Sequence, residues 1–133
     1  MKKFLITTAF LALAISQAGA IDLSKLDPEG RENMENADKI MAMKDWADKL
    51  PPQQRTAFVK SAVGAMEYHR RCQKLPPNLR FAMLGVWMSD AVLATKESKG
   101  LEWMIESTSE AEFCQKLKPA VEQLKTDFSS RGL

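Results

Sequence analysis

The sequence contains few residues of the kinds that usually carry chemistry. Among its 133 residues, His69 is the only histidine, and Cys72 and Cys114 are the only cysteines. A hydrolase triad needs a nucleophile, a base and an orienting group, and a zinc site needs three or four His, Cys or carboxylate ligands. A lone histidine, without an H-x-x-x-H or C-x-x-C motif, supplies neither. We therefore expect no catalytic residues and no metal site.

Cofactor motifs are missing as well. The sequence has no Gly-rich phosphate loop, no nucleotide-binding fingerprint and no haem-attachment motif C-x-x-C-H. Its glutamates occur as pairs that any charged helical protein contains, and these do not indicate a glycosidase. The sequence therefore predicts a protein that has no cofactor and is not an enzyme.

Long apolar runs are also scarce. The most apolar stretch, Phe4 to Ile15, has twelve residues, whereas a membrane-spanning helix needs about 20. Met1-Lys2-Lys3 precedes this stretch, and the small residues of Ser16 to Ala20 follow it. This order is typical of a signal peptide. We therefore predict cleavage after Ala20 and a single helical domain over 21–133, located in the periplasm or secreted.

The predicted mature chain has no charge excess of either sign. Removing residues 1–20 takes away Lys2 and Lys3, which leaves 17 basic and 17 acidic residues. A neutral domain gives no electrostatic reason to bind nucleic acid or an anionic membrane. Because Ile21, not a cysteine, follows the cleavage point, lipid anchoring is not expected either.

Export determines how the two cysteines are interpreted. Oxidising compartments join thiols that a cytosol would keep reduced. We therefore predict a structural disulfide between Cys72 and Cys114. Closing a loop of this length is worth about 4 kcal/mol in the chain-entropy model.

Proline positions divide the mature chain into helices. The phrase Lys49-Leu50-Pro51-Pro52 recurs as Lys74-Leu75-Pro76-Pro77. The looser pattern Lys-Leu-x-Pro also occurs at Lys25-Leu26-Asp27-Pro28 and Lys116-Leu117-Lys118-Pro119. Proline suits the first turn of a helix, while the residue before it is pushed out of the helical region. The pattern predicts helices over 28–50, 52–74 and 77–96, and a final pair separated or kinked at Pro119. A capping box beginning at Ser107, with Glu110 as its partner, is expected to open one of these.

The fold class follows from apolar spacing. Period-2 alternation is absent, so no strand is predicted, and the expected fold is an all-α bundle of four to five helices with one disulfide. The predicted helix over 77–96 has little polar face, which places it at the centre or in an interface. A solenoid is less favoured because only two good repeat copies are present.

A charged segment near the first cysteine is a candidate for partner binding. It contains Tyr68, His69, Arg70, Arg71 and Lys74. The disulfide should bring its cations close to the acidic residues around Cys114. A solvated face is the simpler interpretation, but a charged rim around a partner site is also consistent with these residue types.

The mature chain is rich in methionine. Thioethers bind Cu(I), so a copper or small-ligand carrier that uses methionines and His69 is the alternative function. Most of these methionines fall on apolar helix faces, where they fill gaps in a core without a metal. The seven are Met34, Met41, Met43, Met66, Met83, Met88 and Met104.

The segment Phe58 to Cys114 is similar to the Tai-type immunity proteins, which protect bacterial periplasms from secreted amidases. The likeness consists of Val63-Gly64, Cys72 followed by Pro76-Pro77, an apolar helix that reaches Trp87, and Glu112-Phe113-Cys114. Where that family has a His-Pro and further cysteines, this sequence has Asp90-Ala91. The resemblance implies a periplasmic inhibitor but transfers no inhibitory residues.

Together these features predict an exported, non-enzymatic binding protein that acts through protein–protein contacts. An immunity protein or inhibitor, a chaperone and an envelope adaptor are the versions considered. The expected partner is another exported or envelope protein, and a homodimer is compatible with the same features.

Overall fold

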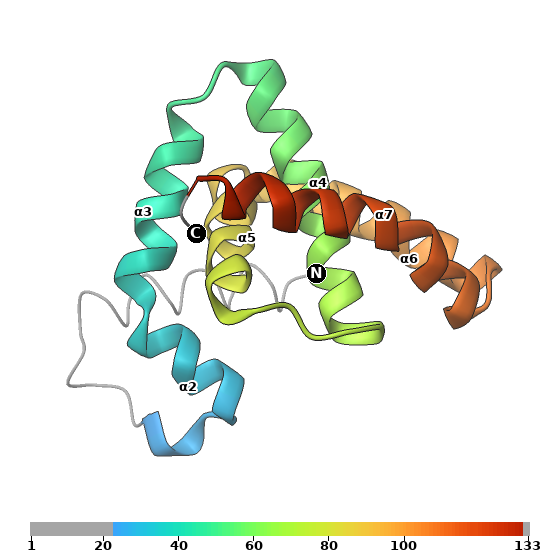
Figure 1. The fold of residues 1–133 in the computed structure, drawn as a ribbon, viewed down its shortest axis with the longest axis horizontal. Helices are drawn as coiled ribbons and strands as arrows, with labels where there is room; N and C mark the ends of the chain where they lie inside the picture. Colours follow the sequence, from blue (N-terminus) through green and yellow to red (C-terminus); the bar gives the residue numbers. More distant parts are fainter. Residues whose placement is uncertain (1–22, 132–133) are drawn as a thin grey trace.

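The computed structural model describes residues 23–131, and this part of the chain is helical throughout, with no strand. A short 3-10 helix, η2, is followed by six α-helices (Figure 1). Their bounds are η2 Leu23–Lys25, α2 Pro28–Glu35, α3 Ala37–Asp48, α4 Pro52–Arg71, α5 Pro77–Ser89, α6 Ala91–Ser107 and α7 Glu110–Ser129. The all-α prediction is confirmed, whereas the expected count of four to five helices was too low. The predicted signal peptide lies outside the described residues.

Proline opens three of the helices, as predicted. Pro28, Pro52 and Pro77 are the first residues of α2, α4 and α5. The α2 start is reinforced by the Asp27 side chain, whose Oδ1 accepts from Gly30 N at 2.6 Å. The preceding prolines Pro51 and Pro76 have ψ near 145°, which keeps them extended. The repeated phrase therefore marks helix boundaries.

Two predicted helices are each broken in two, and neither break involves proline or glycine. At Asn36 the side-chain amide donates to Glu32 O at 2.8 Å, and a φ of −114° separates α2 from α3. At Asp90 a φ of −146° ends α5, and its carboxylate accepts from Leu93 N at 3.1 Å. Both short polar side chains bond local backbone groups and so compete with helix continuation. Gly100 lies inside α6 and does not break it.

Pro119 lies inside α7 and does not end it. Pro119 is exposed, and the apolar stripe that crosses it is buried through Phe113, Val121 and Phe128. Burial of one continuous face outweighs the single backbone bond that proline removes. The predicted capping box is wrong in register: Ser109, not Ser107, caps the helix and accepts from Glu112 N at 3.2 Å.

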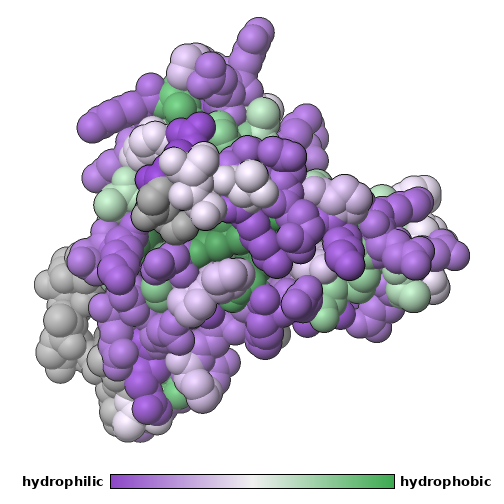
Figure 2. Space-filling model, in the orientation of Figure 1, coloured by the Kyte–Doolittle hydropathy of each residue, from purple (hydrophilic) through white to green (hydrophobic). Residues whose placement is uncertain are grey.

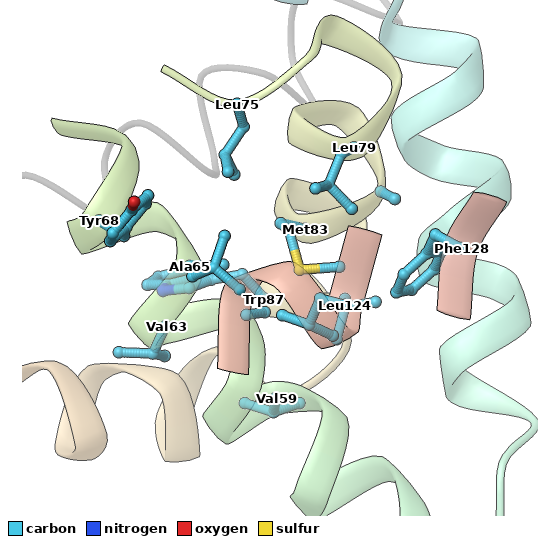
Figure 3. Packing of buried hydrophobic residues seen from close by; sticks show 14 of the residues in the cluster. Val59, Val63, Ala65, Tyr68, Leu75, Leu79, Met83, Trp87, Leu124 and Phe128 are labelled. Carbon is cyan, nitrogen blue, oxygen red and sulfur yellow. The ribbon is translucent and has the colours of Figure 1, made fainter. Parts of the chain in front are cut away.

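The hydrophobic core surrounds α5, as its nearly continuous apolar sequence predicted. One buried cluster joins α4, α5 and α7 (Figure 3). Its members include Val59, Val63 and Ala65 from α4, Leu79, Met83 and Trp87 from α5, and Leu124 and Phe128 from α7. Met83 and Val86 are wholly buried. A helix buried on most of its circumference is the centre of a helical bundle.

Helices α3 and α5 approach each other very closely at Gly85. A Cβ built at this position would lie 2.4 Å from Ile40 O and 2.8 Å from Lys44 N. Both are backbone atoms of α3, so no side-chain rotation could relieve the overlap. The absence of a side chain at Gly85 is what permits this packing.

The disulfide between Cys72 and Cys114 is confirmed. It joins the residue that ends α4 to the N-terminal part of α7, with the two Cα atoms 5.7 Å apart and a sequence separation of 42. At the other end of α7, Phe128 makes edge-on ring contacts with Trp46 of α3 and Phe58 of α4, each with centroids 6.3 Å apart. Helix α7 is therefore fastened near both ends. Among the residues described, no helix has the length and apolar character required to cross a membrane.

Candidate binding surfaces and the buried polar cluster

The five residues predicted to bind a partner separate into buried and exposed groups. Tyr68 and His69 are only 4% and 2% exposed, whereas Arg70, Arg71 and Lys74 are exposed. The first two therefore offer little surface, and only the three cations lie where a partner could reach them. Partner binding by these three cations stays a prediction.

Of the acidic residues around Cys114 that were expected near these cations, Glu110 lies beside Arg71. Arg71 and Glu110 line one groove beside the disulfide, together with Tyr68. The ion pairs of the cations nevertheless involve other residues. Arg71 Nε lies 3.0 Å from Glu67 Oε2, Arg70 also pairs with Glu67, and Lys74 Nζ lies 3.2 Å from a Glu29 oxygen.

Glu67 is a buried carboxylate, and its side chain is only 4% exposed. It lies on α4 three and four residues before the two arginines that pair with it, so all three side chains share one helix face. A buried carboxylate left unpaired would carry a large desolvation cost. The arginines therefore neutralise a charge of their own helix.

His69 is held from both sides by the protein itself. Its Nδ1 accepts a hydrogen bond from Leu75 N at 2.8 Å, and its Nε2 lies 2.9 Å from Glu29 Oε1. Because Nδ1 is the acceptor, the ring proton is on Nε2 and is donated to the carboxylate. With a side chain only 1% exposed, His69 has neither a free nitrogen nor access to solvent.

Glu29 of α2 contacts His69, Lys74 and Arg80, and we call these four residues, with Glu32 and Asn33, the polar cluster. Partial burial by itself raises the pKa of the Glu29 carboxyl, but the hydrogen bonds from His69 and Lys74 and the charge of Arg80 outweigh it. The net result is a pKa below the ordinary value. Glu29 is therefore ionised at neutral pH and binds cationic and donor groups from α4, α5 and the segment between them.

Arg80 supplies a second connection to α2. Its side chain is 7% exposed, and its Nε donates to Asn33 Oδ1 at 3.0 Å. Its Nη2 lies 3.1 Å from Glu32 Oε1, an ion pair without the alignment of a hydrogen bond. Arg80 also lies over the ring of Phe81, with 5.1 Å from Cζ to the ring centroid.

These contacts explain how α2 is attached. The helix has no fully buried residue, so apolar packing contributes little to its position. Glu29, Glu32 and Asn33 lie three and four residues apart on one face, and each of them contacts another member of the polar cluster. The polar cluster therefore holds α2 against α4 and α5. Within the described residues, no group of three or more His, Cys, Asp or Glu side chains could hold a metal ion.

The methionines mostly belong to the core. Met83 is wholly buried in the hydrophobic core, and Met43, Met66 and Met88 pack against that core. These positions agree with gap filling by flexible thioethers.

A surface that the sequence analysis missed lies on α6. Val92 is 81% exposed and Trp103 is 73% exposed, and they are the large apolar residues with the greatest exposure in the described part. They are eleven residues apart, so they lie on the same side of the helix, about 20° apart around it and about 16 Å apart along it. We call this side the α6 face. Its exposed residues are Val92, Lys96, Lys99, Gly100, Glu102, Trp103 and Glu106.

The predicted helix over 77–96, apolar all round and expected at the centre or in an interface, does not distinguish Val92 from its buried neighbours, and it does not reach Trp103. The break at Asp90 starts a new helix, whose buried residues are Ala94 and Ser98. Reading the 3.6-residue period afresh from Ala91 would have set Val92 and Trp103 opposite Ala94 and Leu101. In Figure 1, α6 and α7 extend together away from α3, and the surface at that end in Figure 2 mixes hydrophobic and hydrophilic residues.

Comparison with known proteins does not assign this chain to a family. No family model, no curated protein and no solved structure matches this chain. The resemblance to the Tai-type immunity proteins therefore stays a prediction.

Proposed function

We propose that this chain is an exported, non-enzymatic protein that acts by binding another protein molecule through the α6 face. The observation that carries the proposal is the exposure of Trp103, at 73%, on the same side of one helix as Val92, at 81%. Single exposed apolar residues are ordinary on protein surfaces. A tryptophan is the residue that most often dominates binding energy when a partner buries it.

The surroundings of Trp103 have the composition of an interface. Lys96, Lys99, Glu102 and Glu106 surround the apolar residues with charge. A polar rim around a small apolar centre is the usual anatomy of a non-obligate protein contact. Such a surface stays soluble in the unbound protein, because water reaches every charge.

A catalytic role has less support. Both ring nitrogens of His69 are engaged, by Leu75 and Glu29, and the only two cysteines are joined. A general base must reach the proton that it removes, and a nucleophile must be free to attack. Neither requirement is met by these residues as they stand.

The disulfide supports export, because such bonds form and persist in oxidising compartments outside the cytosol. An immunity protein or inhibitor, a chaperone and an adaptor are all consistent with a binding role. Intact-mass measurement on protein from the producing cell tests the export step, with loss of residues 1–20 and of two thiol protons expected.

The binding role is tested by site-specific photocrosslinking in the producing cell. Trp103 is replaced by the photoreactive residue benzoylphenylalanine in the full chain, and adducts are identified by mass spectrometry. We expect one discrete protein adduct, because a partner that buries position 103 brings its own bonds within reach of the crosslinker.

Lys39 provides the matched control, since it is exposed on α3, far from α6 in Figure 1. The same photoreactive residue at position 39 should give no such adduct. Equal labelling from both positions, or none from position 103, would refute the proposal.

A further inference from the structure

The charges on the α6 face are ordered along the helix. Lys96 and Lys99 lie in its N-terminal half, and Glu102 and Glu106 lie in its C-terminal half. Lys96, Lys99, Trp103 and Glu106 follow one another at steps of three and four residues, so they form a single exposed row. A row that is positive at one end and negative at the other matches a copy of itself laid in the opposite direction.

The positions match as well as the signs. Lys96 lies five residues before Leu101 and Glu106 lies five residues after it, while Lys99 and Trp103 lie two residues before and after it. In an antiparallel pair with a two-fold axis at the level of Leu101, Lys96 faces the second copy's Glu106. At the same time Lys99 faces the second copy's Trp103, the geometry of a cation–π contact. Symmetry makes each contact twice.

Gly100 removes an obstacle at the centre of this row. A Cβ at Gly100 would meet nothing within 4 Å, so no part of the molecule itself requires a glycine there. Glycine in an exposed helix interior costs about 1 kcal/mol relative to alanine. A second helix could approach the bare backbone at this point more closely than elsewhere on the row.

We propose that the α6 face binds a second copy of this chain as an antiparallel, two-fold symmetric helix pair centred at the level of Leu101. The inference rests on the proposed function and names its partner. The interface centres on one helix from each copy and therefore belongs to the small, weak class of contacts. We expect dissociation in the micromolar range or weaker.

A competing register can be distinguished from this one. Sliding the copies by one heptad would place Val92 opposite the second copy's Trp103, an apolar contact. It would also place Lys96 opposite the second copy's Lys99, so that like charges meet twice. In that register Glu106 faces no cation of the row, so the substitution Glu106→Lys would have little effect on dimerisation.

Sedimentation velocity over a concentration series tests the proposal on the oxidised protein. The wild-type sedimentation coefficient should rise with concentration toward that of a dimer. Trp103→Ser should weaken dimerisation at least tenfold. Lys96→Glu and Glu106→Lys should each weaken it about tenfold, because each places like charges together at two symmetric positions.

The double variant K96E/E106K is the decisive arm, because it exchanges the charges and restores both pairs. We expect it to regain most of the wild-type dimerisation. Lys39→Glu on α3 changes the net charge as much as Lys96→Glu does and should leave dimerisation unchanged. Circular dichroism and thermal melts of every variant establish that the helices are retained.

The outcomes separate this inference from the function on which it rests. A wild-type protein that stays monomeric up to about 1 mM overturns the inference. If position 103 still crosslinks a different protein, the proposed function stands without it. A dimer that is unaffected by Trp103→Ser, or a double variant as weak as its parents, overturns the α6 pairing.

Discussion

Replacing a glycine by alanine should have opposite effects at Gly85 and Gly100, although both lie inside helices. Alanine favours a helix over glycine by about 0.5–1 kcal/mol at a position that can accept a Cβ. At Gly100 the Cβ meets nothing within 4 Å, so the full gain is expected. At Gly85 it would lie 2.4 Å from Ile40 O and 2.6 Å from Met43 Cβ, which are tightly held atoms of α3.

The magnitude at Gly85 follows from that overlap. Helix α3 must move away from α5 by about 1 Å to restore ordinary contact, and this movement opens gaps in the core around Met83 and Val86. Overpacking of a well-filled core costs about 1–3 kcal/mol, occasionally more. Subtracting the propensity gain, Gly85→Ala should lower the free energy of unfolding by about 1–2 kcal/mol. This corresponds to a decrease of roughly 4–8 °C in the melting temperature.

Urea unfolding followed by circular dichroism, at protein concentrations low enough to keep the chain monomeric, measures both changes. Gly64→Ala is the internal control, because its Cβ would lie 3.8 Å from Leu117 Cδ2, an ordinary contact, and should be stabilising or neutral. Equal stabilisation by Gly85→Ala and Gly100→Ala would refute the close packing of α3 on α5 and the role given to Gly85.

Three further predictions concern the disulfide and the polar cluster. The double variant C72S/C114S should lose about 4 kcal/mol of stability, because the cross-link closes 42 residues, and melting of the reduced wild type gives an independent check; equal stability with and without the bond would contradict this. His69→Ala should cost about 2–3 kcal/mol, since it leaves Leu75 N–H buried without an acceptor and opens a cavity. His69→Asn should recover part of this loss in the same urea assay, because its oxygen can take the position of Nδ1, and identical losses would argue against the hydrogen bond. Because the pKa of Glu29 is lowered in the folded chain, its ionised form stabilises the fold above the ordinary pKa of 4.5, and this stabilisation disappears as the pH falls through the lowered value. Unfolding across pH 3 to 7 should therefore show Glu29→Gln less stable than wild type at neutral pH, with the gap closing in acid; a gap independent of pH would be the contrary result.

Local chemistry was readable from the sequence where it depended on neighbouring residues. Pro28, Pro52 and Pro77 begin helices because the constraint on φ is a property of the residue itself. The Cys72–Cys114 bond was also predictable, since two cysteines permit one intramolecular pairing. The apolar composition of 77–96 indicated a helix at the centre or in an interface, and its first part, α5, is the central helix.

Other features were misjudged because competing local signals are close in energy. Asn36 and Asp90 break helices through side-chain bonds worth about 1 kcal/mol, a size that packing can override in either direction. Pro119 shows the reverse case, in which burial of one face carries a helix across a residue that often ends it. The sequence shows the candidates for a break but not which of them the packing accepts.

The sequence by itself determined the helical class, the starts of α2, α4 and α5, the disulfide and the scarcity of histidine and cysteine, because each of these depends on residue identity or on neighbours within a few turns. Tertiary structure alone decided that His69 lies buried against Glu29, 40 residues away in sequence, and that Trp103 remains on the surface. Both outcomes depend on which helix faces meet. That choice is made by the packing of the whole core, with the close approach at Gly85 setting the distance between α3 and α5.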